Sequence, residues 1–184
     1  MTMGIAFRRS IALAVFFLTA ATASGQSAAQ PADRWAAVRF LIGSWEGVSE
    51  GRPGKGTSRR QYQLVLRDQL LEVRNTATYP PHEKNPKGEV HEDLGFISFD
   101  RGRKRLVFRQ FHVEGFVIQY AQDETAAPGA LSFTSEAIDN IPAGWRARES
   151  YVQHGPDEFE EIFELAAAGK PFEVYSRTRL KRVK

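Results

Sequence analysis

The sequence contains no cysteine and only four histidines among its 184 residues. Without thiols the chain cannot form disulfides, supply a thiol nucleophile or build a zinc site on thiolates. A metal ion would have to be held by histidine and carboxylate side chains. These absences exclude disulfide-stapled and thiol-dependent classes of protein.

An apolar run of membrane-spanning length is lacking at the N-terminus. The run Ile11–Ala20 is shorter than the about 20 residues that a spanning helix needs. It follows the basic pair Arg8 and Arg9 and precedes small residues that end at Ala23, which is typical of a secretory signal. We expect residues 1–23 to direct export to the periplasm or the exterior, with an uncleaved anchor as the alternative.

Small and polar residues follow this leader, and we interpret residues 24–31 as a flexible spacer. Residues 32–184 are expected to form a single domain. The formal net charge of the whole chain is +3, but Arg8 and Arg9 belong to the leader, which contains no acidic residue. The remaining chain is nearly balanced in charge, so its composition gives no indication of a nucleic-acid partner.

Only one segment suits a helix. In Ala32–Leu41, residues Trp35, Val38, Phe40 and Leu41 are apolar and Asp33 is a candidate cap. We expect this short helix to plug one end of the fold.

Short runs rich in β-branched and aromatic residues fill the rest of the chain, separated by Gly, Pro, Asn and Asp. This punctuation is typical of successive hairpins. The ten runs are Gly43–Gly51, Ser58–Arg67, Leu70–Tyr79, His91–Phe99, Lys104–His112, Phe116–Gln122, Ala130–Ile138, Trp145–His154, Glu158–Ala166 and Phe172–Val183.

No helical crossover separates these runs, so parallel pairing is excluded and an antiparallel meander is expected. Closing the meander into a barrel removes both exposed edges, whereas a sandwich would usually need longer connections. The sequence therefore predicts an all-β, closed, antiparallel up-and-down barrel of about ten strands, with a short N-terminal helix over one end.

The last two runs offer a local test of this interpretation. Alternation places three acidic residues on one face of the ninth run and three basic residues on one face of the tenth. On the opposite faces lie apolar residues and Thr178. The acidic set is Glu158, Glu160 and Glu164; the basic set is Arg177, Arg179 and Lys181; the opposite faces carry Phe159, Phe163 and Leu165 in the ninth run and Phe172, Val174, Thr178 and Leu180 in the tenth.

The stretch Phe40–Glu50, FLIGSWEGVSE, places Gly43-Ser44-Trp45 directly after the helix. A Gly-x-Trp at the start of the first strand resembles the calycin superfamily, which includes lipocalins and fatty-acid-binding proteins. The resemblance implies that this motif closes one barrel end and that an Arg from the last strand, here Arg177 or Arg179, packs over the indole. A guanidinium stacked on Trp also gains cation–π energy.

Two further motifs are similar to the nitrobindin-like branch of this superfamily. They are Trp45-Glu46-Gly47 and the sequence HEDLGF at residues 91–96, and the resemblance covers nearly the whole domain. It implies a haem held by a histidine near the end of the barrel and a reaction with reactive nitrogen species. No histidine follows His154, so His112 is the candidate axial ligand in this chain.

A barrel of ten strands favours a lumen that holds one small ligand. In the fifth run, Leu106 and Phe108 compete with Val107, Phe111 and Val113 for the inner face. A slip of one residue would exchange every inward side chain. The candidate ligand-binding residues are Trp45, Tyr62, Asn75, Phe108, Gln110, His112, Phe116, Tyr120 and Phe163.

Two further stretches contain residue types found in metal and phosphate sites, but neither has the spacing of such a site. His82 with Glu83 and His91 with Glu92 and Asp93 flank a proline-containing loop, but their spacing is not that of a zinc-binding helix, so we expect a solvated loop and no metal. Residues 51–57, GRPGKGT, lack the spacing of a phosphate-binding loop and are interpreted as a turn.

Three functions remain open. The first is non-catalytic binding of a small apolar or amphipathic molecule, of the fatty-acid or tetrapyrrole class, inside the barrel. The second is a haem barrel in which His112 is the axial ligand. The third is a barrel with a filled core that serves as an interaction module. No catalytic motif is present that would favour an enzyme of another kind.

Overall fold

The computed structural model describes residues 33–83, 85–124 and 130–184. The expected signal and spacer lie outside these residues. Ten strands form a closed antiparallel barrel in which every strand pairs with its neighbours in sequence and β1 pairs with β10. The predicted fold class is confirmed.

One short helix precedes the strands, which follow one another in the order expected. The elements are η1 (Ala36–Leu41), β1 (Gly43–Gly51), β2 (Gly54–Val65), β3 (Leu70–Tyr79), β4 (Glu89–Asp100), β5 (Arg105–His112), β6 (Val117–Gln122), β7 (Ala130–Asp139), β8 (Arg146–Gly155), β9 (Glu158–Ala166) and β10 (Glu173–Arg182).

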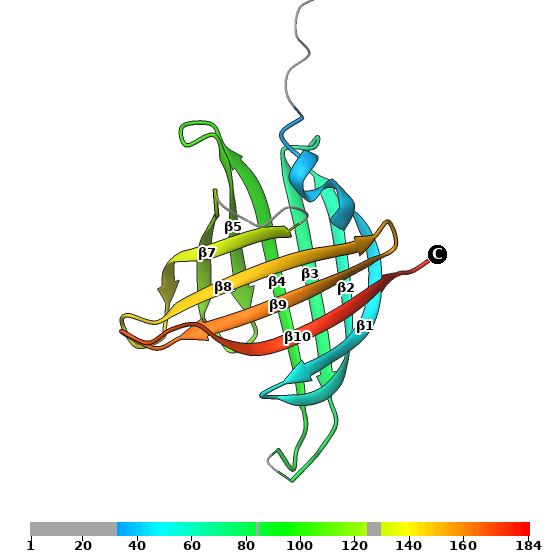
Figure 1. The fold of residues 1–184 in the computed structure, drawn as a ribbon, viewed down its shortest axis with the longest axis vertical. Helices are drawn as coiled ribbons and strands as arrows, with labels where there is room; N and C mark the ends of the chain where they lie inside the picture. The colour runs from blue at the N-terminus through cyan, green and yellow to red at the C-terminus, as the bar shows by residue number, and fades with distance from the viewer. Residues whose placement is uncertain (1–32, 84, 125–129) are drawn as a thin grey trace, which may run out of the picture. The chain divides into compact units, whose positions relative to one another are not determined.

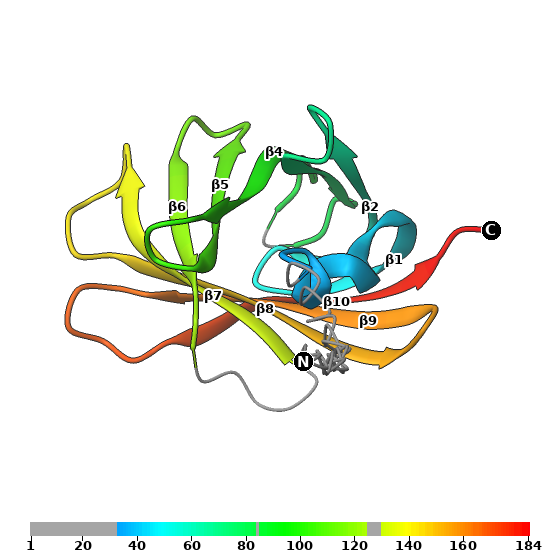
Figure 2. The ribbon, with the colours of Figure 1, turned by 90° about the horizontal axis from the view of Figure 1, so that it is seen from above.

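The helix is a 3₁₀ helix and is shorter than expected, beginning at Ala36. Asp33 accepts a hydrogen bond from the backbone N–H of Trp35 at 3.0 Å, which holds the turn before the helix. Trp35 is buried and donates its indole N–H to the carbonyl of Asp68 in the β2–β3 turn. Figures 1 and 2 show η1 over one end of the barrel, while the β3–β4 loop extends from the opposite end. We call these the helix end and the loop end.

Aromatic side chains fill the barrel beneath η1. Trp45 is 1% exposed and its ring centroid lies 4.6 Å from that of Phe159, with their planes 79° apart. Phe159 also contacts Phe40, Tyr62 and Tyr151 edge-on or tilted. The expectation that Trp45 faces the interior is confirmed, and the lumen around it is packed.

Arg182, at the end of β10, is the residue that covers Trp45, with its guanidinium carbon 4.1 Å from the ring centroid. It donates hydrogen bonds to the carbonyls of Ile42 at 2.7 Å and Phe40 at 3.0 Å. The expectation that Arg177 or Arg179 would do so is wrong, because both lie on the outer face of β10.

Gly43 provides the room that Arg182 needs. Its φ is +131°, and a Cβ there would lie 2.6 Å from a guanidinium nitrogen of Arg182. Any other residue would be strained in this conformation and would displace the Arg182 side chain. The closing role expected for Gly43 therefore has a physical basis in this structure.

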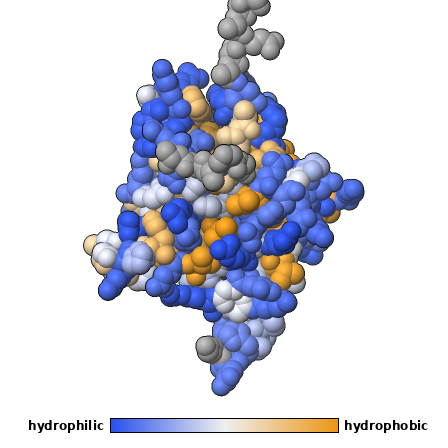
Figure 3. Space-filling model, in the orientation of Figure 1, coloured by the Kyte–Doolittle hydropathy of each residue, from blue (hydrophilic) through white to orange (hydrophobic). Residues whose placement is uncertain are grey.

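The hairpin of β9 and β10 has the charge arrangement that the sequence predicts. Arg179 pairs with Glu158 and Arg177 with Glu160 on the outer face. The inward assignment of Val174 is wrong, because a β-bulge between Val174 and Ser176 changes the alternation and leaves Val174 exposed. Figure 3 shows the side of the barrel that β9 and β10 cross in Figure 1. Its surface is mostly hydrophilic, with separate apolar patches.

Among the residues that the structure describes, no helix has the length and apolar character needed to cross a membrane.

Candidate functional site

A cavity of about 620 Å³ occupies the loop end of the barrel. Its size is in the range of small-molecule sites. The described structure thus contradicts a core filled throughout, on which the interaction-module hypothesis depended. The lining includes apolar side chains from β6, β7, β9 and the connections β5–β6 and β7–β8. Its charged or polar side chains come from β2, β3, β4, β5, β8, β9 and the β5–β6 connection. The apolar set includes Phe116, Ile118, Ile138, Ile141, Pro142, Trp145, Phe163 and Leu165; the polar set includes Arg60, Asn75, His91, Asp93, Gln110, His112, Glu114, Glu149 and Glu161.

Five of the nine candidate ligand-binding residues line this cavity: Asn75, Gln110, His112, Phe116 and Phe163.

The other four belong to the packed helix end, where they are 1% exposed or less: Trp45, Tyr62, Phe108 and Tyr120.

The phase of β5 explains part of this division. Leu106, Phe108 and Gln110 are buried, whereas Phe111 is 46% exposed. The inner face is therefore the one that carries His112, as the candidate list assumed. Position along the strand then decides whether an inward side chain lines the cavity. Leu106 and Phe108 lie toward the helix end, and Gln110 and His112 lie toward the loop end.

An ion pair between Arg60 of β2 and Glu161 of β9 crosses the barrel interior. Arg60 donates from Nε and Nη2 to the Glu161 carboxylate at distances from 2.6 to 3.2 Å, and both side chains are almost completely buried. Burial alone would lower the pKa of Arg60, but Glu161 outweighs it and the pKa is raised. Arg60 consequently keeps its charge, and the Glu161 carboxyl group lines the cavity.

Asp93 of β4 is held by two amide side chains. Asn75 and Gln110 each donate an N–H to Asp93 Oδ1 at 2.8 Å, and the Tyr120 hydroxyl donates to Gln110 at 3.3 Å. Burial raises the pKa of Asp93, but the hydrogen bond with His91 and the charge of Arg60 lower it below its usual value overall. Asp93 is therefore an oriented carboxylate whose second oxygen faces His91.

His91 lies between two carboxylates near the mouth of the cavity. Its Nδ1 is 2.7 Å from Glu114 Oε1 and its Nε2 is 3.5 Å from Asp93 Oδ2. Burial disfavours the imidazolium, but Asp93 and Glu114 outweigh burial and raise the pKa of His91 to about 9. The imidazole is thus protonated at neutral pH.

His112 has the opposite character. Its ring stacks on Phe116 with centroids 4.1 Å apart, and burial lowers the pKa of His112 to about 4. Both ring nitrogens are buried and have no hydrogen-bond partner among the described residues, as is also true of Asn75 Oδ1. Since buried polar atoms in proteins are almost always paired, these atoms indicate a place for a polar ligand group.

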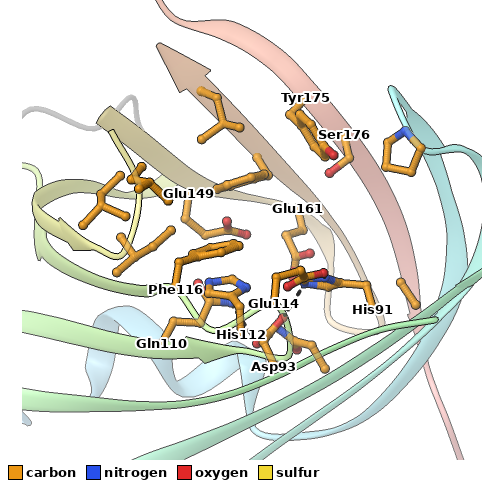
Figure 4. Close-up of a pocket in the computed structure, with 18 of the residues that line it drawn as sticks. His91, Asp93, Gln110, His112, Glu114, Phe116, Glu149, Glu161, Tyr175 and Ser176 are labelled. Atoms are coloured by element: carbon orange, nitrogen blue, oxygen red, sulfur yellow. Dashed lines mark hydrogen bonds and ion pairs between the residues drawn. The ribbon is translucent and has the colours of Figure 1, made fainter. Parts of the chain in front are cut away.

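Glu149 of β8 completes the polar wall. Burial raises the pKa of Glu149 well above its usual value, and the nearby Glu161 raises it further. Figure 4 shows Glu149 and Glu161 across the pocket from His91, Asp93, His112 and Glu114.

The sequence interpretation missed Arg60, Asp93, Glu149 and Glu161 as lumen residues. Strand alternation contains the signal for two of them. Arg60 is two residues from Tyr62, and Glu161 is two residues from both Phe159 and Phe163, which were expected to face inward. A charged residue on an apolar strand face is an indication of a buried ion pair or a site.

The loop histidine His82 and the acidic residue Glu92 do not join the cavity. His82 Nε2 hydrogen-bonds to the carbonyl of Pro53 at 3.0 Å, and Glu92 is exposed. His91 and Asp93 lie two residues apart on β4 and therefore share a face of the strand, which is the face that lines the cavity. The expected turn near Pro53 is present as the short connection between β1 and β2, so β2 begins at Gly54 and not at Ser58.

Comparison with solved structures shows the same class of barrel. The chain is similar to the crystal structure of Rv2717c from M. tuberculosis, with a TM-score of 0.62 and 17% identity over 83% of this chain and 99% of that chain. A de novo designed fluorescence-activating β-barrel matches with a TM-score of 0.40 and 14% identity over 80% of this chain and 97% of that chain. No family model matches the sequence, and no curated protein matches it significantly. At this identity, the likeness to Rv2717c shows the fold alone.

Proposed function

We propose that the barrel binds a small amphipathic molecule in the cavity at its loop end, without catalysis. The observation that carries this proposal is a cavity of about 620 Å³ that joins apolar walls to buried, unpartnered polar atoms at Asn75 and His112. Burial of apolar ligand surface against Phe116, Ile138 and Phe163 supplies affinity, at about 25 cal/mol per Å².

The charges of the cavity define the polar end of this ligand. The carboxylates of Asp93, Glu114 and Glu161 outnumber the cations Arg60 and His91, which they already pair with, and Asn75 presents an unpartnered amide oxygen, so the wall is rich in acceptors. A ligand carboxylate directed inward would be repelled, whereas a group with N–H or O–H donors would be bound. Within the classes expected from the sequence, a free fatty acid therefore fits less well than a larger amphipathic molecule whose acidic groups face the solvent.

Displacement of a fluorescent probe tests this proposal. N-phenyl-1-naphthylamine, a neutral apolar dye, should bind with increased emission, and dodecylamine should displace it at lower concentration than dodecanoate. Ile138→Trp, which adds bulk inside the cavity, should weaken dye binding at least tenfold. The matched control is Ala137→Trp, because Ala137 is the adjacent residue on the exposed face of β7. Equal binding by both variants would contradict the cavity as the site.

A second candidate function is haem binding through His112, as the nitrobindin-like resemblance implies. The specific observation in its favour is that both nitrogens of His112 are buried without a partner and that the ring is neutral at pH 7. A neutral imidazole is the form that ligates haem iron. Bound haem would supply the iron chemistry; the chain would contribute the imidazole, the stacked Phe116 and the apolar wall.

The visible spectrum after addition of haemin separates the two candidates. Haem ligation predicts a shifted Soret band that His112→Ala abolishes and that His154→Ala, at an exposed position, preserves. A Soret band unchanged by His112→Ala would leave haem without its proposed ligand.

Export by residues 1–23 is part of the same proposal, since a binding barrel outside the cytoplasm would meet its ligand there. Expression in a bacterial host with N-terminal sequencing of the product tests it. The expected mature N-terminus is Ser24, and a product that retains residues 1–23 would contradict cleavage at this site.

A further inference from the structure

Three side chains with metal-binding atoms converge on one wall of the cavity. His91 and Asp93 lie two residues apart on the inner face of β4, and His112 of β5 is the register partner of Asp93. One ligand atom from each lies within 4.8 Å of the other two. Figure 4 shows all three on the same wall of the pocket.

The spacing of these atoms is close to that of a metal centre. Bonds of about 2.0 to 2.2 Å in a tetrahedral site place neighbouring ligand atoms roughly 3.3 to 3.5 Å apart. His91 Nε2 and Asp93 Oδ2 are already 3.5 Å apart. His112 would complete the set by a small side-chain movement, and it would lose no hydrogen bond by moving, because its nitrogens have no partner in the described structure.

The surrounding groups orient these ligands as outer groups do at metal sites. Asn75 and Gln110 both bind Asp93 Oδ1, which leaves Oδ2 for the cavity. Glu114 binds Nδ1 of His91 at 2.7 Å, which directs Nε2 toward Asp93. A carboxylate on the far nitrogen of a ligating histidine, and hydrogen bonds on a ligating carboxylate, are recurrent features of metal centres.

We propose that His91, Asp93 and His112 bind one divalent transition-metal ion at the cavity wall, with the Nε2 proton of His91 released to the solvent as the ion binds. Two imidazoles and one carboxylate suit Zn²⁺ and similar ions, whereas Mg²⁺ and Ca²⁺ prefer sets of oxygen ligands. The fourth position faces the cavity and is open to a small donor ligand. This site goes beyond the proposed amphipathic-ligand function, because the ion binds to the wall whether or not such a ligand is present.

Metal titration of the purified protein tests the proposal. After treatment with EDTA and its removal, calorimetry at pH 8 should show one equivalent of Zn²⁺ bound, and no binding of Mg²⁺ at the same concentration. Co²⁺ should give the visible d–d bands of a four- or five-coordinate ion. His112→Ala and Asp93→Asn should each weaken Zn²⁺ binding at least tenfold and remove the Co²⁺ bands.

Control variants separate this site from weaker alternatives. His154→Ala removes an exposed histidine, and Glu89→Gln removes a carboxylate of the neighbouring group formed by Glu89, His91 and Glu114; neither should change Zn²⁺ affinity. Circular dichroism confirms that each variant is folded, and His91→Ala replaces Asp93→Asn if the latter is not. Absence of stoichiometric Zn²⁺ binding would overturn the proposal. So would binding that survives His112→Ala but is lost in Glu89→Gln.

Discussion

The helix end and the loop end of this barrel are built from the same strands but from different kinds of side chain. On β5 the inward residues change from Leu106 and Phe108 to Gln110 and His112, and on β3 they change from Leu71 and Val73 to Asn75. At the helix end, aromatic and aliphatic groups pack to exclude solvent. At the loop end, polar and apolar groups together surround a cavity. Packing and the cavity therefore depend on separate segments of each of these strands, and the proposed ligand binding would involve only the second of them.

The largest effect should come from removing an aromatic ring at the helix end. Phe159→Ala deletes a completely buried ring that contacts Trp45, Tyr62 and Tyr151. We expect a loss of about 3 to 5 kcal/mol in the free energy of unfolding, measured by urea denaturation. Phe163→Ala, four residues along β9 at the open cavity, should cost about 1 to 2 kcal/mol, since no closed void forms. Equal losses would show that the two ends are not energetically distinct.

The next largest loss of stability is expected for the ion pair at the boundary between the two ends. Arg60→Met leaves Glu161 buried without its partner, and we expect the free energy of unfolding to fall by about 3 kcal/mol. The double variant Arg60→Met and Glu161→Met removes both charges and should lie within about 1 kcal/mol of the wild type. Denaturant unfolding of the wild type, the two single variants and the double variant measures the coupling energy between Arg60 and Glu161. A double variant as unstable as Arg60→Met would contradict this prediction.

A smaller effect is expected at the closure of the helix end. Arg182→Ala removes three hydrogen bonds to carbonyls and the stacking on Trp45. The expected loss is about 2 kcal/mol, accompanied by a shift in Trp fluorescence. Arg177→Ala, which removes an exposed ion pair on the same strand, should cost about 0 to 1 kcal/mol. Similar losses would argue against Arg182 as the closing residue.

The smallest effect that we expect is a pH dependence at the loop end. Burial raises the pKa of Glu149, which faces Glu161 of β9, Arg60 of β2 and Asp93 of β4. The stability that depends on protonated Glu149 is present below the unfolded pKa of about 4.3 and is lost as pH rises toward the folded pKa.

Glu149→Gln cannot ionise, so its melting temperature should exceed that of the wild type at pH 8 but differ little at pH 4. Thermal unfolding across this range measures the difference, with Glu92→Gln, at an exposed position of β4, as the control. A constant difference at all pH values would show that folding does not change the pKa of Glu149.

The barrel was predictable because it depends on strand alternation and on the absence of helical crossovers, which are both local properties. The approximate bounds of the strands and the inward position of Trp45 follow from the same pattern. The inward placement of Val174 failed because a bulge is a local change of register that alternation does not contain. Arg182 was missed because the choice among three arginines of β10 depends on where the strand ends relative to η1.

The site was predictable only in part for a different reason. Alternation identifies the face of a residue but not its depth in the barrel, so Tyr62 and Asn75 appear equivalent although only Asn75 reaches the cavity. Asp93, Glu149 and Glu161 are charged, and sequence alone favours exposure for charged residues. Amide groups of the neighbouring strands β3 and β5 hold Asp93 in its inward position. Glu161 is held there by Arg60, which lies 101 residues away in the sequence.

The contact of Arg182 with the carbonyl of Phe40 joins positions 142 residues apart. Because this contact and the β1–β10 pairing require the last strand of the barrel, the barrel cannot close before β10 has been synthesised. Long-range pairing of this kind slows folding and leaves β1 with an unpaired edge until the end. Since an unpaired strand edge is a template for aggregation, the pairing of β1 with β10 is the step that removes this hazard from the sheet.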